Sequence, residues 1–357
     1  MSCNLYSFAK ELLCLLIQTP SISGNEEHTA NRIMHVFTER NIPVERIKNN
    51  VIVRSSHWDA AKPTILLNSH HDTVKPVEGW NTNPYEAVCV EEKIFGLGSN
   101  DAGASLVALI CTFLHYYNDS DVPYNLLFVA SAEEEISGKN GIECVLPTLG
   151  DISVGIVGEP TGMNMAVAEK GLLVLDCVAK GIAGHAAHSQ GENAIYNAIK
   201  DIQWLQTYEF PKKSDLLGAV KMTVTGISAG KQHNVIPDEC TFMVDVRTNE
   251  RYANKEVFDI ISASLKSHTK ARSFRLNSSS ISRSHALVQR GVELGCELFG
   301  SATLSDQAVM SNFPTVKIGP GDTYRSHTAQ EYIFESELFH GIDTYIALLK
   351  NLTITKI

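Results

Sequence analysis

The sequence predicts an α/β protein whose main domain is interrupted by a smaller inserted α+β domain. Short apolar runs typical of buried strands alternate with stretches of helical periodicity in the first half of the chain and again near its end. Between residues 168 and 278 the expected strands are longer and more polar. We therefore expect a discontinuous main domain of residues 1–167 and 279–357, and an inserted domain of residues 168–278.

The N-terminal segment predicts two helices. Asn4 to Gln18 carries apolar residues at helical spacing, and Pro20 follows where such a helix has ended. Ser23 and Glu26 have the spacing of a capping box, in which two side chains bond the backbone N–H groups at a helix start. A second helix is therefore expected to begin at Ser23.

Strands and one apolar helix fill the rest of the first segment. Asp101 introduces the helix, which runs from about residue 102 to 117. The strand-like runs lie at 44–47, 50–54, 64–69, 128–132 and 154–157.

The insert and the C-terminal segment continue this pattern. In the insert we expect strands at 172–179, 219–224 and 240–246 and helices at 193–207 and 252–268. A Ser-rich stretch at 277–283 suits a hinge. After it come a helix near 286–298, a strand at 314–318 and a closing helix at 335–349.

Composition restricts the class of function. The chain has 357 residues, of which 44% are hydrophobic, and can fill a substantial core. Its net charge of −10, without a basic block, argues against nucleic acid or an anionic membrane as partner. The N-terminus lacks a signal-type pattern and apolar runs are too short for a membrane span, so we expect a cytoplasmic protein. Eight scattered cysteines suggest reduced, buried thiols.

Side chains able to bind metal follow several of the expected strands. In open α/β sheets, ligands bind at the carboxyl ends of the strands. The side chains are His70, Asp72, Asp101, Glu134, Glu135, Glu159 and His327. Imidazoles and carboxylates without a thiolate suit two Zn²⁺ ions, with Co²⁺ or Mn²⁺ as substitutes. A shared carboxylate can hold two metals about 3.5–4 Å apart, while another carboxylate stays free to move a proton.

Each signal also has a simpler structural interpretation. Three consecutive carboxylates from Glu133 to Glu135 are more typical of a solvated loop, although like charges are costly unless a cation takes them up. An aspartate before a helix, such as Asp101, is usually an N-cap. His327 alone would more often be a structural histidine. Only their occurrence together favours a metal site.

Five motifs, in chain order, resemble those of the dinuclear zinc M20 peptidase and deacylase family. They are His70-His71-Asp72-Thr73-Val74, Gly98-Ser99-Asn100-Asp101, Glu133-Glu134-Glu135, Gly158-Glu159-Pro160-Thr161 and Ser326-His327-Thr328-Ala329-Gln330-Glu331. Within the family, the sequence looks most similar to the acetylornithine deacetylase and succinyl-diaminopimelate desuccinylase members, because of its length and the glutamate at position 159. The resemblance implies a zinc-peptidase-like catalytic domain with a central mixed sheet flanked by helices. It also implies an inserted α+β lid domain that forms a homodimer.

The resemblance implies roles for the residues at the strand ends. His70 and Glu159 would bind one zinc, Glu135 and His327 the other, and Asp101 would bridge both. Glu134 would be the general base and proton shuttle. Asp72 would orient His70 and fix its tautomer. On a strand, His71 should point away from His70, so we interpret it as structural.

The resemblance also assigns residues outside the metal site. His185 would stabilise the oxyanion from the lid, with His188 as the alternative. Asn234 and Arg247 would bind the substrate, Arg247 by gripping a carboxylate, although the simpler interpretation of Arg247 is an exposed strand end. Gly319 and Gly321 would let backbone amides approach the substrate.

The function implied is that of a zinc-dependent amidohydrolase acting on linear amide bonds. It would remove the acyl group from an N-acyl-L-amino acid, with N-acetyl- or N-succinyl-L-ornithine in arginine biosynthesis as first choice. A succinyl-diaminopimelate desuccinylase or a dipeptidase of the same family is the alternative. A more distant one is a non-catalytic metal-binding scaffold, which would tolerate loss of Glu134, whereas this sequence keeps it.

Overall fold

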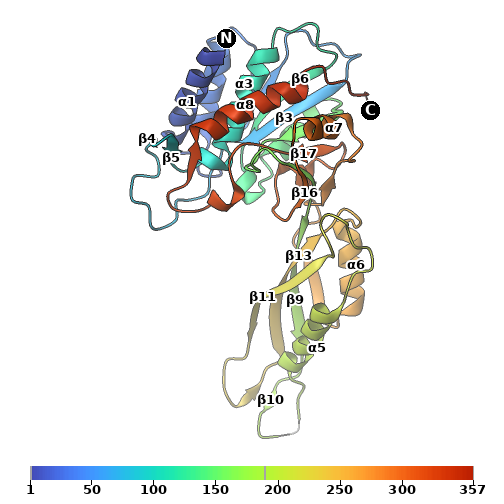
Figure 1. Cartoon of the computed structure of the whole chain (residues 1–357). Helices are drawn as coiled ribbons and strands as arrows, with labels where there is room; N and C mark the ends of the chain where they lie inside the picture. The colour runs from blue at the N-terminus through green and yellow to red at the C-terminus, as the bar shows by residue number, and fades with distance from the viewer. Residues whose placement is uncertain (1, 189, 357) are drawn as a thin grey trace. The chain divides into compact units, whose positions relative to one another are not determined.

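The structure is a computed structural model that describes residues 2–188 and 190–356 (Figure 1). These residues form two compact units. The first comprises the chain up to Val167, Ser280–Phe299 and the chain from Ser305 onward, and the second comprises Ala168–Ser279 and Gly300–Leu304. Among the described residues, no helix combines the length and the apolarity that a membrane span requires.

Helices occur in both units. The α-helices are α1 (Ser2–Ile17), α2 (Glu27–Thr38), α3 (Ala104–Tyr116), α4 (Ile142–Val145), α5 (Ala194–Thr207), α6 (Asn254–Ser264), α7 (Ala286–Glu293) and α8 (Glu335–Leu349). Short helical turns are η1 (Ser99–Gly103), η2 (Glu134–Ile136), η3 (Leu146–Thr148), η4 (Asp306–Val309) and η5 (Thr323–Arg325).

Strands form four sheets within the described residues. They are β1 (Val44–Ile47), β2 (Asn50–Arg54), β3 (Thr64–His70), β4 (Val88–Val90), β5 (Lys93–Phe95), β6 (Asn125–Ser131), β7 (Val154–Val157), β8 (Met165–Glu169), β9 (Gly171–Lys180), β10 (Gly184–His185), β11 (Lys221–Ala229), β12 (Val235–Ile236), β13 (Glu239–Thr248), β14 (His268–Ala271), β15 (Ser279–Ser280), β16 (Leu298–Ser301), β17 (Thr315–Lys317) and β18 (Tyr332–Phe334).

The largest sheet mixes parallel and antiparallel strands in the order β1-β2-β6-β3-β7-β17-β8-β15, with β16 beside β8. Its central strands β6, β3, β7 and β17 run parallel to one another, whereas β2 pairs antiparallel with β6 and β8 pairs antiparallel with β17. Every residue of β3 and β6 is buried, because helices cover both faces, and such strands read as continuous apolar runs. The predicted central mixed sheet flanked by helices is confirmed.

Packing on the two faces of this sheet fixes its strands. On one face α1, α3 and α8 lie together (Figure 1), and the ring of Phe37 in α2 lies 6.0 Å from Phe113 in α3 and 5.7 Å from Phe128 in β6. On the other face, Ile142 and Val145 of α4 join a core with residues of β2, β3 and β6. Burial of these apolar side chains is the main force that holds the strand ends in place.

The second unit has a separate core. Its antiparallel sheet has the order β11-β13-β9-β14. Buried and half-buried residues alternate along β9, and the buried set, including Leu173 and Leu175, packs with residues of α5 and α6 such as Leu205 and Ile261. A separate smaller sheet domain is therefore confirmed. The pair β10–β12 lies outside this sheet.

The predicted capping box is wrong. Helix α2 begins at Glu27, and its N-cap residue Glu26 makes no side-chain capping hydrogen bond. The Ser23 hydroxyl donates instead to the carboxylate of Asp72 at 2.7 Å. The Glu26 carboxylate turns away from the helix and accepts from Gly24, Asn49 and Glu133.

Two predicted helices are shorter than expected. Helix α6 ends at Ser264, and residues from His268 form β14 instead. Helix α7 ends at Glu293, because Gly295 adopts a left-handed conformation with φ of 90° just beyond it.

Candidate metal centre

The carboxyl ends of neighbouring strands bring the predicted side chains together. In the parallel register His70 at the end of β3 lies opposite Ser131 at the end of β6. The chain leaving β6 turns at once into Glu133–Glu135, and Glu159 follows β7 two residues beyond its end. Asp101 lies in η1 and His327 follows η5. This edge is where an open α/β sheet binds ligands.

The first cluster of potential ligands consists of His70, Asp101 and Glu159. Nε2 of His70 lies 3.2 Å from Oδ1 of Asp101 and 3.7 Å from Oε1 of Glu159. The Glu159 oxygen is buried and has no hydrogen-bond partner among the described residues. A buried carboxylate oxygen without a partner is costly, and a bound cation would remove that cost.

The second cluster consists of Asp101, Glu135 and His327. Nε2 of His327 lies 2.9 Å from Oε2 of Glu135 and 3.6 Å from Oδ2 of Asp101. Asp101 thus directs one carboxylate oxygen to each cluster, as a bridging ligand must. Nitrogen and oxygen donors in two such sets fit two divalent metals of the zinc, cobalt or manganese type.

The titratable groups of the centre shift one another's pKa. The hydrogen bond between His327 and Glu135 raises the pKa of His327 to about 9. Burial raises the pKa of Glu159 to about 8, and the charge of Asp101 adds to this shift. Burial alone would lower the pKa of His70, but hydrogen bonds with Asp101 and Asp72 outweigh it and hold this pKa well above its usual range. Because a ligand atom must lose its proton to bind a metal ion, metal binding at this centre should release protons.

Glu134 lies near His70 of the first cluster and directly precedes Glu135 of the second, and it belongs to neither cluster. Its side chain is 12% exposed, and its Oε2 lies 3.9 Å from Nε2 of His70. Burial raises its pKa well above the usual range, and the charges of Glu159 and Asp306 add to the shift while His70 opposes it. Glu135 is therefore a potential metal ligand, and its neighbour Glu134 is a carboxyl group left free to hold a proton.

Comparisons with known proteins agree with this geometry. Residues 66–351 match the model of peptidase family M20/M25/M40. The chain belongs to this family. It is thus a metallo-hydrolase that acts on amide bonds, and the predicted membership of the family is confirmed.

Relatives with established names span the whole chain. The sequence is 27% identical to the LysW-lysine/LysW-ornithine hydrolase of Sulfurisphaera tokodaii over 97% of this chain and 96% of that protein. It is 26% identical to a succinyl-diaminopimelate desuccinylase of Rickettsia bellii over 98% of this chain and 97% of that protein. The fold matches the Bacillus subtilis YXEP protein, a dinuclear metal-binding peptidase of the M20 family, with a TM-score of 0.72, 18% identity and coverage of 97% of both chains.

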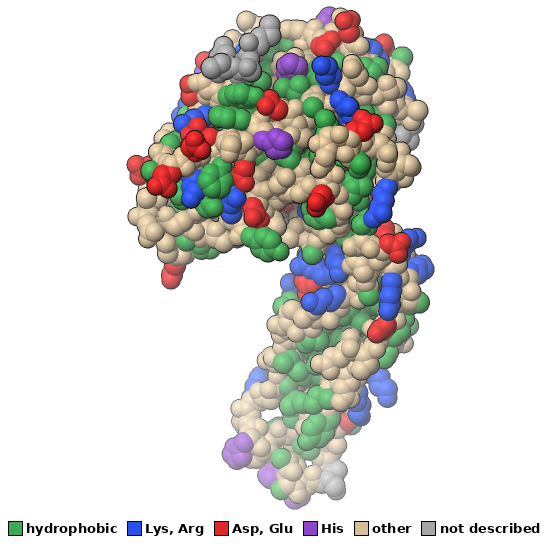
Figure 2. Space-filling view, in the orientation of Figure 1, with side chains coloured by type: hydrophobic (Ala, Val, Ile, Leu, Met, Phe, Trp, Pro, Cys, Tyr) green, Lys and Arg blue, Asp and Glu red, His purple; other side chains and the backbone are tan. Residues whose placement is uncertain are grey.

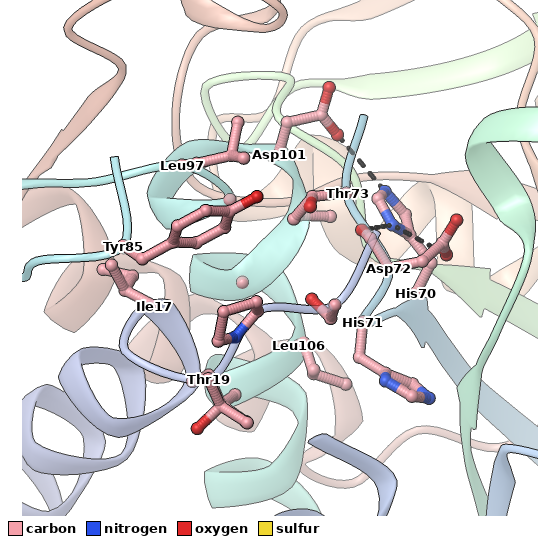
Figure 3. A pocket seen from close by; sticks show the side chains of 16 residues that line it. Ile17, Thr19, His70, His71, Asp72, Thr73, Tyr85, Leu97, Asp101 and Leu106 are labelled. Atoms are coloured by element: carbon pink, nitrogen blue, oxygen red, sulfur yellow. Dashed lines mark hydrogen bonds and ion pairs between the residues drawn. The ribbon is translucent and has the colours of Figure 1, made fainter. Parts of the chain in front are cut away.

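Two of the potential ligands of this M20 family chain, His70 and Asp101, line a pocket that has both polar and apolar walls. Figure 3 shows Asp101 pointing toward the His70 ring, and the apolar residues Ile17, Leu97 and Leu106 also line the pocket. Apolar walls lower the local dielectric constant, so charge interactions at this edge are stronger than in water.

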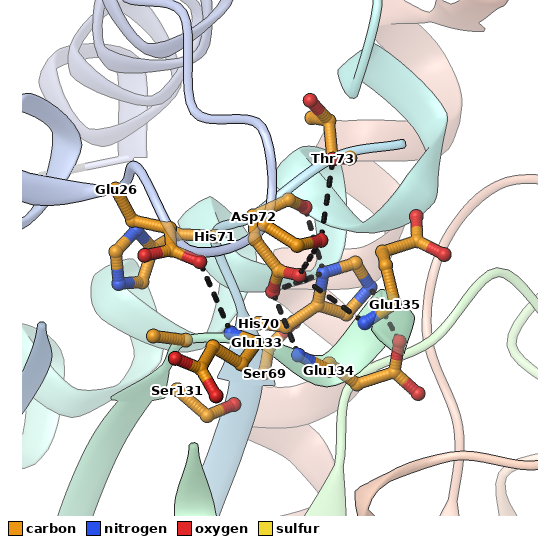
Figure 4. A network of polar contacts seen from close by, with 12 residues as sticks. Glu26, Ser69, His70, His71, Asp72, Thr73, Ser131, Glu133, Glu134 and Glu135 are labelled. Carbon is orange, nitrogen blue, oxygen red and sulfur yellow. Dashed lines mark hydrogen bonds and ion pairs between the residues drawn. The ribbon is translucent and has the colours of Figure 1, made fainter. Parts of the chain in front are cut away.

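Asp72 supports the centre mainly through the backbone of the glutamate turn. Its Oδ1 accepts from the Glu134 amide at 3.0 Å and its Oδ2 accepts from the Glu135 amide at 3.2 Å (Figure 4). The nearer contact to Nδ1 of His70 is the backbone carbonyl of Asp72, at 2.9 Å, and the carboxylate lies 3.5 Å away. His70 is thus oriented chiefly by a carbonyl, which the sequence does not reveal.

His71 lies away from both clusters. It is buried, its Nδ1 lies 2.9 Å from the hydroxyl of Thr29, and its Nε2 lies 2.9 Å from the carbonyl oxygen of Asn49. Burial lowers its pKa. These contacts give it the structural role that the strand alternation predicts.

Glu331 holds the loop that carries Asp101. Its buried carboxylate accepts from the amides of Gly98, Asn100 and Asp101 at 3.1, 2.8 and 2.9 Å. Burial raises the pKa of Glu331 to about 8. The side-chain amide of Asn100 also donates to the carbonyl of Asp322 at 3.1 Å. The loops of Asp101 and His327, which serve the same second cluster, are therefore joined directly.

The two predicted glycine positions pack against protein. The Gly319 amide donates to the hydroxyl of Thr161 at 3.0 Å, and a Cβ atom at Gly319 would clash with Ser105 and with the carbonyl of Glu159. Gly321 has φ of 95° and faces Asn100. Contrary to the interpretation from sequence, the Gly319 amide is not free for a substrate, and both glycines allow close packing behind the ligands.

The remaining predicted residues lie in the second unit. His185 of β10 and His188 are exposed, with ring centroids 5.2 Å apart. The carbonyl of the exposed Asn234 accepts from the amide of Ala186 at 2.9 Å. Arg247 of β13 is already paired with Asp245, through Nε at 2.9 Å and Nη2 at 3.1 Å.

Sequence reasoning does not identify three buried carboxylates near the centre, Glu26, Asp306 and Glu331, as functional candidates. The sequence places Glu331 in a family-like motif without indicating its role, and the spacing of Glu26 suggests only a capping box. Asp306 accepts from the hydroxyl of Ser131 at 2.5 Å, and burial raises its pKa to about 6. The sequence offered no signal for Asp306, because its contact joins positions 175 residues apart.

Proposed function

We propose that this M20 family amidohydrolase uses two metal ions to remove the acyl group from an N-acyl-L-amino acid. The observation that carries the proposal is the division of Asp101 between two ligand clusters, with Glu134 beside both and bound to neither. One cluster could serve a structural metal. Two clusters that share a carboxylate, next to a free carboxyl group of raised pKa, suit hydrolysis better.

Zinc is the metal that this donor set favours, with cobalt or manganese as substitutes. His70 and Glu159 would hold one ion and Glu135 and His327 the other, with Asp101 between them. When bound, such ions supply Lewis acidity toward the amide carbonyl and toward water.

The chain itself supplies proton transfer and charge stabilisation. Glu134 would take a proton from the attacking water and deliver it to the nitrogen of the departing amine. As a carboxyl group outside both ligand clusters, Glu134 could hold that proton between the two steps. His185 would donate a hydrogen bond to the oxygen that becomes negative, from the second unit of its own chain or of a partner chain.

A positively charged area on the second unit supports an anionic substrate. Lys221 of β11 lies opposite Arg247 of β13 in the sheet register. Burial, together with the charges of Lys221 and Arg247, lowers the pKa of Lys170, as expected for neighbouring cations. Figure 2 shows Lys and Arg side chains gathered at one end of this unit. Arg247 keeps N–H groups that Asp245 does not use, so it can bind the substrate carboxylate, with Asn234 as a further donor.

Ornithine is the amine that we propose first. A relative named for hydrolysis of LysW-lysine and LysW-ornithine supports a diamino acid with one free amino group. The acyl group would be acetyl or succinyl. Release of ornithine would place the enzyme in arginine biosynthesis. The relative named as a succinyl-diaminopimelate desuccinylase keeps that substrate as the second candidate.

We further propose a homodimer formed through the second unit. Large apolar side chains stand exposed there, among them Tyr196 of α5 at 64% and Ile227 of β11 at 57%. Strand β11 is an edge strand of its sheet and could pair with another chain. From the sequence, we also propose that the protein is cytoplasmic and acts on a small polar substrate there.

A substrate panel tests the proposal. The zinc-loaded enzyme is given N-acetyl-L-ornithine, N-succinyl-L-ornithine, N-succinyl-diaminopimelate and a simple dipeptide, and kcat/KM is compared. We expect one ornithine derivative to be preferred about 100-fold or more, since buried polar groups discriminate strongly. If all four amides remain intact while both metals are bound, the proposed substrate class is wrong.

A further inference from the structure

Glu26 is a buried carboxylate that the proposed reaction does not use. Its side chain is fully buried, and its hydrogen-bond partners are uncharged N–H donors. Oε1 accepts from the Gly24 and Glu133 amides, the latter at 3.3 Å, and Oε2 accepts from the side-chain amide of Asn49 at 2.8 Å. Burying a carboxylate is costly even when uncharged donors face it, so its position needs an explanation.

Helix α2 does not supply that explanation. Glu26 precedes the helix, but its side chain caps no helical amide. Its neighbour Glu27 is exposed and occupies the first helical position, where an acidic residue favours the helix dipole. The Glu26 carboxylate instead points to the turn after β6 (Figure 4).

That turn needs support from outside. Glu133 and Ser137 both have positive φ, 54° and 47°, a conformation that non-glycine residues adopt at a cost. Glu134 and Glu135, the proposed proton shuttle and ligand, lie between them. A turn of this kind keeps its shape only when the surrounding groups determine it.

Two buried carboxylates supply this support. Glu26 accepts the amide of Glu133, and Asp72 accepts the amides of Glu134 and Glu135. Three consecutive N–H groups of the turn are thus bound from two sides.

The loop before α2 connects the two carboxylates. Ser23 donates its hydroxyl to Asp72 and its amide to the carbonyl of Thr73 at 3.2 Å, while Gly24 donates to Glu26. The loop therefore joins the glutamate turn to the end of β3, where His70 lies.

We propose that Glu26 is a positioning residue, which fixes the glutamate turn so that Glu134 faces the reacting water and Glu135 faces its metal. This inference rests on the roles proposed above for those two glutamates. Glu26 touches neither substrate nor metal in this account, and it acts through the backbone of the turn. Residues that orient metal ligands in this way commonly affect metal affinity or activity by about 10- to 100-fold.

Asn49 allows a sharp test by exchange of donor and acceptor. Both oxygens of Glu26 accept hydrogen bonds from N–H groups. In Glu26→Gln one oxygen becomes an NH₂ group, which would face an N–H donor of Asn49 or of the turn and could not bond to it. Asn49 cannot simply rotate, because its Oδ1 already accepts from Arg46 at 2.6 Å. In the double variant Glu26→Gln/Asn49→Asp, the introduced glutamine would donate to the introduced carboxylate and keep its oxygen for the Glu133 amide, and Arg46 would keep an acceptor. Asn49→Asp alone would place a second carboxylate against that of Glu26, so this variant should also lose activity and Co²⁺ affinity.

The experiment measures kcat, KM, Co²⁺ affinity by visible absorption and the unfolding temperature for each variant. The amide cleaved best by the wild-type enzyme is the substrate, and Glu27→Gln is the exposed matched control. For Glu26→Gln we expect kcat and Co²⁺ affinity to fall about 10-fold while KM stays within about twofold. The double variant should recover most of both losses, and Glu27→Gln should match the wild type.

Other outcomes identify which proposal fails. If Glu26→Gln changes only the unfolding temperature, or if the two substitutions are additive without rescue, Glu26 is not a positioning residue. Glu134→Gln is measured in parallel. If it loses turnover while Glu26→Gln does not, only the inference about Glu26 is wrong. If Glu134→Gln keeps turnover, the proposed proton shuttle is wrong, and the role of Glu26 falls with it.

Discussion

At the scale of single residues, carboxylates of the same type do different work according to what faces them. Asp101 turns one oxygen to His70 and the other to His327. Glu134 meets mostly other acids in a buried position, and its pKa rises. Glu331 faces three amides and acts as an acceptor for a loop. The surroundings of each carboxylate therefore decide its role.

Substitutions at two of these residues should separate proton transfer from metal binding. Glu134→Ala should lower kcat by about 10²–10⁴-fold and keep both metals, because Glu134 is proposed to carry a proton and belongs to neither ligand cluster. Asp101→Ala should reduce the occupancy of both sites, because the clusters share this residue. Metal content by atomic absorption and kcat on the same samples check both expectations. Near-normal turnover in Glu134→Ala, or loss of a single metal in Asp101→Ala, would contradict the assigned roles.

At the scale of elements, the ends of strands and helices carry most of the specific contacts. The strands of the large sheet present His70, the glutamate turn and Glu159 at one edge because β3, β6 and β7 run parallel in register. Helix α7 begins with a side-chain cap, in which Nδ1 of His285 accepts from the Leu287 amide at 3.2 Å. Near the C-terminal end of α7, Arg290 donates a hydrogen bond to the carbonyl of Ala347 in α8 at 3.2 Å.

The His285 cap should make stability depend on pH. Burial lowers the pKa of His285, so the folded state favours the neutral imidazole that can accept a hydrogen bond. This contribution is present above the unfolded pKa of about 6.5 and is lost as pH falls through the lower folded pKa. His285→Ala should lower the free energy of unfolding by about 1 kcal/mol at pH 7.5 and by less at pH 5.5.

Urea unfolding of metal-free protein at both pH values measures this effect. His285→Asn is the control, because asparagine caps a helix without titrating in this range. The stability difference between wild type and His285→Asn should change with pH. A difference that stays constant from pH 7.5 to 5.5 would show that the cap does not titrate.

At the scale of the whole molecule, the chain consists of two units with separate cores. Both ligand clusters belong to the first unit. The second unit has its own sheet and its own buried set from Leu173 to Leu265. Metal binding should therefore stabilise one unit much more than the other.

Calorimetric unfolding with and without metal tests this expectation. Ligand binding to a folded state adds stability in proportion to the logarithm of the ratio of ligand concentration to Kd, about 4 kcal/mol at a 1,000-fold ratio. Removal of metal with a chelator should lower the unfolding temperature of the first unit by several degrees. The transition of the second unit should remain in place. A single transition that moves as a whole would show that the two units unfold together.

Much of this architecture could be predicted from the residues in order. The continuous apolar runs of β3 and β6 identify strands buried on both faces, and the polar residues just after them identify the functional edge. The errors fall where a side chain has distant partners. The spacing of Ser23 and Glu26 fits a capping box, but both side chains bind residues brought near by the sheet, at Asp72 and Glu133.

The sequence by itself determined the elements, the mixed α/β fold, the family and the types of side chain available for metal and proton chemistry, because these depend on local periodicity and short motifs. The family resemblance already implied which carboxylates share a site. Only the tertiary structure decided which oxygen of Asp101 faces which histidine, and which buried acids hold the backbone of the turn. Burial and the pairing of charges depend on which strand ends the fold places side by side, and nothing in the order of residues records those distances.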